Sequence, residues 1–318
     1  MTTTNTLITK PPAADLPKPA PATVTAINQV KAGFVAGKKP VKSARQPKNL
    51  DEAENDYLKF CIYGGSGTGK TITIAPLLEE GLTVLVLSTD IGGSGLSTVS
   101  LALKKKGKAE LRRNCKEFEI QSYDELDDFI SNPAGFWPDF FNTDIDVLFL
   151  DGFSAFQNCH LSEKVLGFDA GKNATDAREA GLFMGQQDWG ATLRGTTRTL
   201  DKFLRMRNEV TGKSYSKIIT CLESDKAKDQ YGETKTGPMI QGAASKHMEA
   251  AFDIIFRARK KKKDNAMTYF YGMDGSSDRI ITKSRGFEFN IIEPGDFGAI
   301  WKSACLQKGI PSGKKVAA

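Results

Sequence analysis

The 318-residue chain contains 40% hydrophobic, 9% aromatic and 26% charged residues, a composition that is typical of globular proteins and excludes a wholly disordered chain. No apolar run approaches the roughly 20 residues that span a bilayer, so the sequence predicts no membrane segment. The net charge of +6 is unevenly distributed, because residues 1–50 carry eight Lys and Arg against one acid while the other 268 residues sum to −1.

The first 50 residues also contain seven of the 13 prolines, and such a segment cannot bury enough apolar surface to offset the entropy of ordering. We therefore predict a disordered basic arm at 1–50, one α/β domain of enzyme size at 51–305 and a flexible tail at 306–318. The start of the chain lacks the apolar segment of a secretory signal, which predicts a cytoplasmic protein. The cysteines are widely spaced and are interpreted as core thiols: Cys61, Cys115, Cys159, Cys221 and Cys305.

Short apolar segments rich in β-branched residues predict buried strands at 57–63, 83–88, 118–120, 146–150 and 217–222. A helix is predicted at 71–80, where Gly81 stops it. A second helix begins at Ser122, which has capping-box spacing with Glu125, and runs through Phe129. Apolar residues between 189 and 204 fall on one face of a long helix. This alternation predicts a mostly parallel sheet flanked by helices.

The last third of the domain differs in pattern. Short strands are predicted at 251–258, 267–271 and 279–282, joined by turns. We expect them to form a C-terminal β-hairpin extension of the sheet.

The most specific motif is the glycine-rich sequence from 64 to 71, which matches G-x-x-x-x-G-K-[ST] in full. A predicted strand precedes it and a predicted helix follows, the context in which backbone N–H groups surround a polyphosphate. Lys70 would neutralise the β- and γ-phosphates and the Thr71 hydroxyl would bind Mg²⁺. The residues predicted to bind ATP are Gly64, Gly65, Ser66, Gly67, Thr68, Gly69, Lys70 and Thr71.

Two carboxylates complete the predicted site. Asp151 ends the apolar strand at 146–150, as a Walker B aspartate does, and would hold the metal through its water shell. The next residue is Gly152 and not Glu, which disfavours motors whose catalytic base adjoins the Walker B aspartate. Asp90 follows the strand at 83–88, and residues just past such strand ends line the ligand crevice. We therefore predict that Asp90 orients the attacking water.

With a late Lys-x-Arg sequence at 283–285, this arrangement resembles the RecA-like ATPases. It is most similar to the phage-type, AAA-domain nucleotide-binding ATPases that are related to the RecA and RadA recombinases, some of which act in single-strand annealing. The likeness covers roughly residues 55–290. It implies a RecA-like P-loop NTPase core that hydrolyses ATP and acts on single-stranded DNA in recombination, annealing or replication.

The resemblance also implies residue roles beyond the P-loop. Lys283 and Arg285 match the Lys-x-Arg-Phe-Gly motif of RadA proteins, whose cations reach the γ-phosphate of a neighbouring subunit, which requires a homo-oligomer, ring or filament. In this sequence the Gly and Phe are exchanged, at Gly286 and Phe287. Glu223 stands where the family has a polar sensor of the γ-phosphate. The polar segment 224–237 beyond it corresponds to a loop that touches DNA in RecA-like proteins, or is simply a mobile loop.

Two basic clusters are candidate contacts for nucleic-acid phosphates, or are ordinary solvated surface. Tyr231 and Tyr269 could add stacking faces. The early basic cluster comprises Lys104, Lys105, Lys106, Lys108, Arg112 and Arg113. The late basic cluster comprises Arg257, Arg259, Lys260, Lys261, Lys262 and Lys263, near the tip of the predicted hairpin.

Other functions remain open from the sequence. One is a P-loop kinase of a small molecule, although an Arg-rich lid would then be expected nearer the P-loop. Another is a nucleotide-switched assembly or packaging factor that makes no DNA contact. Metal hydrolysis is poorly supported, because His160 and His247 are the only histidines and lack paired ligand spacing. The sequence does not separate ATP from GTP, although it contains no guanine-reading Asn-Lys-x-Asp string.

Overall fold

The computed structural model describes residues 57–90, 95–161, 186–225, 236–240, 244–263, 266–272, 282–288 and 296–314. The predicted arm at 1–50 lies outside these residues, as do Tyr231 and most of the polar segment 224–237.

An eight-stranded mixed sheet forms the centre of the described domain, and it confirms the predicted α/β fold with a mostly parallel sheet and a C-terminal hairpin. Six parallel strands lie in the order β8-β1-β5-β4-β2-β3, and β9 and β10 both pair antiparallel with β8. The strands are β1 Lys59–Tyr63, β2 Val84–Ser88, β3 Cys115–Glu119, β4 Val147–Asp151, β5 Ser216–Cys221, β8 Ile254–Lys263, β9 Ala266–Gly272 and β10 Lys283–Ser284.

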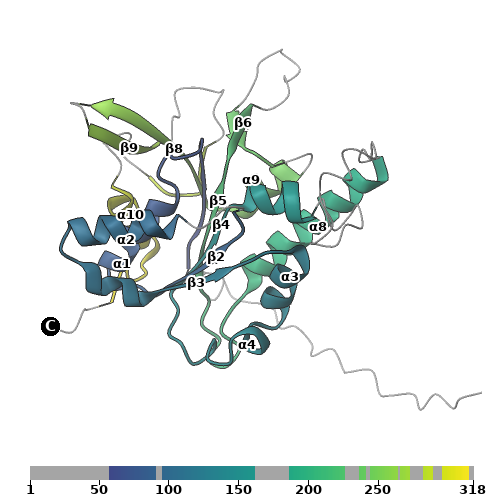
Figure 1. The fold of residues 1–318 in the computed structure, drawn as a ribbon, viewed down its shortest axis with the longest axis horizontal. Helices are drawn as coiled ribbons and strands as arrows, with labels where there is room; N and C mark the ends of the chain where they lie inside the picture. Colours follow the sequence, from purple (N-terminus) through teal and green to yellow (C-terminus); the bar gives the residue numbers. More distant parts are fainter. Residues whose placement is uncertain are drawn as a thin grey trace, which may run out of the picture. The chain divides into compact units, whose positions relative to one another are not determined.

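Helices cover both faces of the sheet (Figure 1). One face is covered by α1 (Ile74–Glu79), α2 (Leu96–Lys105) and α10 (Phe297–Lys308). The other is covered by α3 (Tyr123–Ser131), α8 (Gln186–Arg205) and α9 (Ala244–Ala251). The short helices α4 (Pro133–Phe136) and α5 (Phe153–Ala155) and a π-helical turn at Phe156–Leu161 lie in the connections. None of the helices in the described ranges is long and apolar enough to cross a bilayer.

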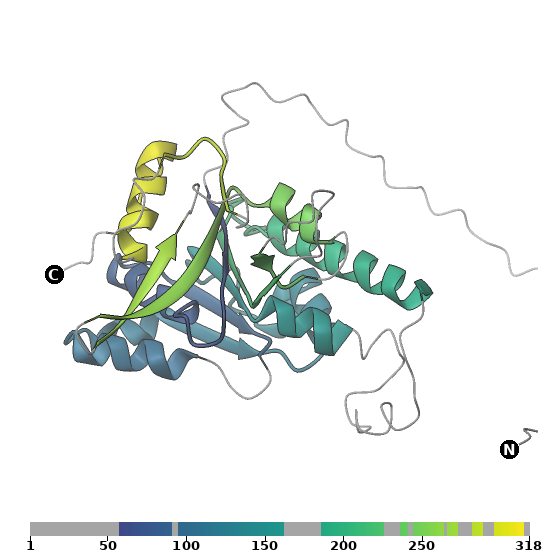
Figure 2. The same cartoon turned by 90° about the horizontal axis from the view of Figure 1, so that it is seen from above.

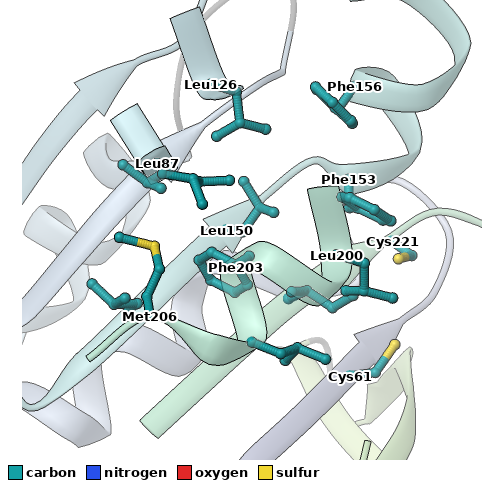
Figure 3. Close-up of a cluster of buried hydrophobic side chains, with 14 of the residues drawn as sticks. Cys61, Leu87, Leu126, Leu150, Phe153, Phe156, Leu200, Phe203, Met206 and Cys221 are labelled. Atoms are coloured by element: carbon teal, nitrogen blue, oxygen red, sulfur yellow. The ribbon is translucent and has the colours of Figure 1, made fainter. Parts of the chain in front are cut away.

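The sheet is buried on both faces, which explains why its strands are continuously apolar and do not alternate. In β4, for example, Leu148 and Leu150 face the α3 and α8 side, whereas Val147 and Phe149 face the α1 and α10 side. Figure 3 shows the first of these cores, where Leu150 lies close to Phe203 of α8. Two cores on one sheet hold its strand ends in fixed relative positions.

The structure differs from the predicted elements in several places. The predicted strand at 251–258 overlaps the end of α9, and β8 begins only at Ile254 and continues to Lys263. The weak third strand lies at Cys115–Glu119 and not at 118–120. The polar segment after Glu223 begins with a strand, because β6 (Glu223–Asp225) and β7 (Thr236–Pro238) form a two-stranded antiparallel ribbon.

The chain beyond the predicted domain boundary at 305 is anchored up to residue 314. Helix α10 continues to Lys308, and the backbone N–H of Ile310 donates to the carbonyl of Cys305 at 3.0 Å. The Trp301 indole N–H donates to the carbonyl of Ser312 at 2.8 Å. Lys314 pairs with Asp146 at 2.6 Å, so this segment closes over the amino end of β4.

Candidate functional site

The glycine-rich loop joins the carboxyl end of β1 to a 3-10 turn at Thr71–Thr73, from which α1 continues. Gly67 and Gly69 have φ values of +67° and +89°, a region that L side chains rarely adopt. The Thr68 hydroxyl donates to the carbonyl of Gly65 at 2.8 Å and closes the turn. The predicted strand, glycine turn and helix are therefore all present.

Lys70 points back into this loop. Its ammonium donates to the carbonyls of Gly64 and Gly65, each at 2.9 Å. Burial lowers the pKa of Lys70, and the carboxylates of Asp151 and Asp90 oppose this effect. The cation is thus fixed at the centre of the loop, facing both predicted carboxylates.

Asp151 ends β4 and is only 2% exposed. One carboxylate oxygen accepts a hydrogen bond from the Thr71 hydroxyl at 2.7 Å, and the other accepts one from the hydroxyl of Thr220. The Thr220 hydroxyl in turn accepts from the backbone N–H of Gly152 at 2.9 Å. Sequence reasoning missed Thr220, although a threonine near the end of the predicted strand at 217–222 was a visible signal.

Asp90 is held beside Asp151 by the ends of two neighbouring strands. The hydroxyl of Thr89 donates to the carbonyls of Asp151 and Gly152 at 2.9 and 2.8 Å. Gly152 has a φ of +85°, and a Cβ on it would collide with the Asp90 carboxylate. The side chain of Asp90 therefore occupies the space that a larger residue at 152 would need. Burial, followed by the charge of Asp151, raises the pKa of Asp90.

A cleft at the carboxyl edge of the sheet brings these groups together. Its walls include residues 66–72 of the loop, Asp90, Asp151 and Thr220, with Gly95 and Thr98 from the start of α2 and Tyr269 from β9. This is the edge at which open α/β sheets bind ligands.

The donor set fits a magnesium nucleotide. In nucleotide sites, Mg²⁺ takes most of its oxygen ligands from phosphates and water and only a few from the protein, such as a carboxylate and a hydroxyl. Asp151 and Thr71 present such a pair at hydrogen-bond distance. Backbone N–H groups of a glycine loop that opens a helix suit the phosphates.

Glu223 lies beside the same loop. Its carboxylate accepts a hydrogen bond from the Arg257 guanidinium at 2.9 Å. Its other oxygen would be 3.8 Å from a Cβ on Gly65. Glu223 also begins β6, so the β6–β7 ribbon starts beside the P-loop.

Lys283 lies in the edge strand β10, which β8 separates from β1, and Arg285 follows this strand. In β10, Lys283 pairs with Ile255 of β8, two residues before Arg257, which pairs with Tyr63 just before the P-loop. The Lys283 ammonium donates to the carbonyls of Glu249 and Ala250, and Arg285 donates to the carbonyl of Ala250 at 2.7 Å. Within one chain, both cations therefore hold the carboxyl end of α9 and do not reach the cleft.

Two lysines of the early basic cluster form ion pairs with a nearby glutamate. Lys106 and Lys108 both bind the Glu79 carboxylate, at 2.6 and 2.7 Å. Lys104 and Lys105 lie in the last turn of α2, where cations interact favourably with the helix dipole.

These observations define a P-loop fold in which Lys70, Thr71, Asp90 and Asp151 line one cleft. A family model described as an AAA domain matches residues 56–286, which is more than half of the chain. The chain therefore belongs to the AAA domain family of nucleotide-binding ATPases. A comparison with curated proteins gave no match.

Proposed function

We propose that the protein is a Mg²⁺-dependent ATPase of the RecA type that acts on single-stranded DNA. One observation carries the ATPase part: Lys70, Thr71, Asp151 and Asp90 converge on a single cleft at the carboxyl ends of β1, β2 and β4.

The roles follow from the chemistry of each group. Loop N–H groups and Lys70 hold the phosphates, and Thr71 and Asp151 hold the metal, which neutralises charge on the transferred phosphoryl group. Asp90 accepts the proton of the attacking water, for which a raised pKa is an advantage in a general base. Thr220 positions Asp151 through its hydrogen bond.

Action on DNA and assembly into a homo-oligomer form the second part of the proposal. The β6–β7 ribbon supports it, because the ribbon begins at Glu223 beside the P-loop and leads into the polar segment. The separation of Lys283 and Arg285 from their own cleft is compatible with a cation donated to a neighbouring subunit.

Hydrolysis measurements test the ATPase. We expect phosphate release that requires Mg²⁺ and is lost in Asp151→Asn, with the exposed Asp128→Asn as the matched control. Stimulation by single-stranded DNA tests the second part. Hydrolysis that single-stranded DNA does not stimulate would support the ATPase part of the proposal and contradict the DNA partner.

The kinase alternative predicts a phosphorylated acceptor in place of free phosphate, so the same assay separates it. A nucleotide-switched assembly factor predicts hydrolysis that depends on protein concentration and is insensitive to DNA.

A further inference from the structure

In the hairpin formed by β8 and β9, the side chains of the late basic cluster alternate between two faces. In the antiparallel register, Ala258 lies opposite Tyr271 and Lys260 lies opposite Tyr269. Because alternate residues of a strand share a face, these four side chains lie on one side of the hairpin. Arg257 and Arg259 lie on the other side, where Arg257 pairs with Glu223.

The first of these faces rests on the P-loop. The Tyr271 hydroxyl donates to the carbonyl of Gly69 at 2.8 Å. A Cβ on Gly69 would stand 2.6 Å from the Tyr269 ring, and a Cβ on Gly64 would collide with the carbonyl of Ala258. Figure 2 shows the hairpin, in yellow-green, lying over the blue and purple elements that begin with β1. Two tyrosines and the backbone of β8 therefore fix the hairpin to the loop.

This contact brings Lys260 to the loop. Its ammonium is 3.4 Å from the position that a Cβ on Gly67 would occupy. The side chain is exposed, and no carboxylate among the described residues pairs with it. Lys260 thus differs from Arg257, whose charge is balanced by Glu223.

Three sources of positive potential border this loop: its own N–H groups, the ammonium of Lys70 and the ammonium of Lys260. Cations brought together repel one another unless an anion lies between them. A polyphosphate supplies that anion, and charge-assisted hydrogen bonds to it are stronger than neutral ones.

We infer that Lys260, carried by the β8–β9 hairpin, is a second phosphate-binding cation of the nucleotide site and acts in the same chain as the P-loop. This inference rests on the proposed nucleotide function. It differs from the predicted action of Lys283 and Arg285, which requires a second subunit. It also assigns Lys260 to nucleotide and removes it from the nucleic-acid cluster.

Equilibrium titrations with ATP and with ADP, both with Mg²⁺, test the assignment on the full chain. We expect Lys260→Ala to weaken ATP binding about tenfold, the loss expected for one hydrogen bond to a charged group. Lys260→Arg should retain most of the affinity. The matched control is Lys116→Ala, an exposed lysine of β3, and its affinity should equal that of the wild type. Lys260→Gln is a second variant, and circular dichroism checks the folding of each.

Affinity of both Lys260→Ala and Lys260→Gln within twofold of the wild type, in folded protein, would overturn the inference. If the wild type binds no nucleotide, the proposed function itself fails. If only Lys70→Ala loses binding, the proposed function stands and Lys260 has no part in it.

A mixing experiment tests the action within one chain. Lys260→Ala is mixed with a Lys70→Ala variant that cannot bind nucleotide but retains Lys260. A cation acting within its own chain cannot rescue the partner, so ATP affinity per Lys260→Ala chain should stay reduced. Recovery to the wild-type affinity would show that Lys260 is donated between subunits.

Discussion

At the residue scale, the Asp90 carboxylate occupies the space that a side chain at position 152 would need. The glycine leaves room for the Asp90 carboxylate, which lies beside Asp151, the proposed metal ligand, at the end of the neighbouring strand. Asp151 is tied to Thr71 and Thr220 by hydrogen bonds, whereas burial and the charge of Asp151 raise the pKa of Asp90.

Asp90→Asn should lower the rate of ATP hydrolysis about 10²- to 10⁴-fold and leave nucleotide affinity nearly unchanged, because a general base acts in the transition state. In the wild type, hydrolysis should fall with decreasing pH through a pKa above the usual value for Asp, since the raised pKa protonates the base earlier. Rates and affinities measured across pH check both statements. An unchanged rate in the variant would contradict the assigned role.

Lys217 is a second residue whose environment makes a prediction. It is fully buried in β5, donates to the carbonyl of Met206 at 2.7 Å and lies 4.4 Å from the ring centre of Tyr57. Burial, with a smaller contribution from Lys59, lowers the pKa of Lys217 to about 7.

Because the unfolded chain keeps its lysine protonated to about pH 10.4, it binds more protons than the folded chain between pH 7 and that value. The free energy of unfolding should therefore rise with pH in this window, by up to about 1.4 kcal/mol per pH unit from this residue. Lys217→Met should remove that slope. Urea denaturation at several pH values measures it, and equal slopes in the two proteins would contradict the assignment.

At the scale of elements, Lys283 and Arg285 donate hydrogen bonds to the carboxyl end of helix α9. Arg285→Ala removes a donor from the carbonyl of Ala250 and a charge from the carboxyl end of the helix. We expect a loss of about 0.5–1 kcal/mol in the free energy of unfolding. Lys116→Ala, at an exposed position in β3, is the control. Equal stability of Arg285→Ala and the wild type would show that the cap contributes nothing.

The elements also show what the sequence could and could not predict. The central strands and the P-loop were predictable because buried parallel strands are apolar throughout and the loop has a fixed spacing. Helix α9 was missed because its polar sequence, ASKHMEAA, follows a segment without periodicity and buries only one side, with Met248 at its centre. The late basic cluster was treated as one surface, whereas alternation along β8 directs Arg257 and Lys260 to opposite faces.

The roles of Thr220 and Lys217 in β5 could not be predicted from the sequence either. Both are polar residues beside the apolar centre of the strand, and their partners, Asp151 and Met206, lie outside it. Only the packing of β5 against β4 and the end of α8 reveals them.

At the scale of the whole molecule, the distribution of charge predicts how DNA binding depends on salt. If the basic clusters and the arm neutralise about five phosphates, the logarithm of single-strand affinity should fall with the logarithm of salt concentration with a slope near −3.5. Fluorescence anisotropy with labelled single strands measures this. A slope near zero, or no binding at low salt, would remove the proposed DNA partner and leave the nucleotide site intact.

We propose above all that the glycine-rich loop after β1, with Lys70, Thr71 and Asp151, binds a magnesium nucleotide. Isothermal titration of the full chain with ATP and Mg²⁺ tests it most directly. We expect one nucleotide per chain for the wild type and loss of at least tenfold in affinity for Lys70→Ala, because the variant loses the cation at the centre of the loop. Absence of binding by folded wild-type protein, or equal affinity of Lys70→Ala, would contradict the account.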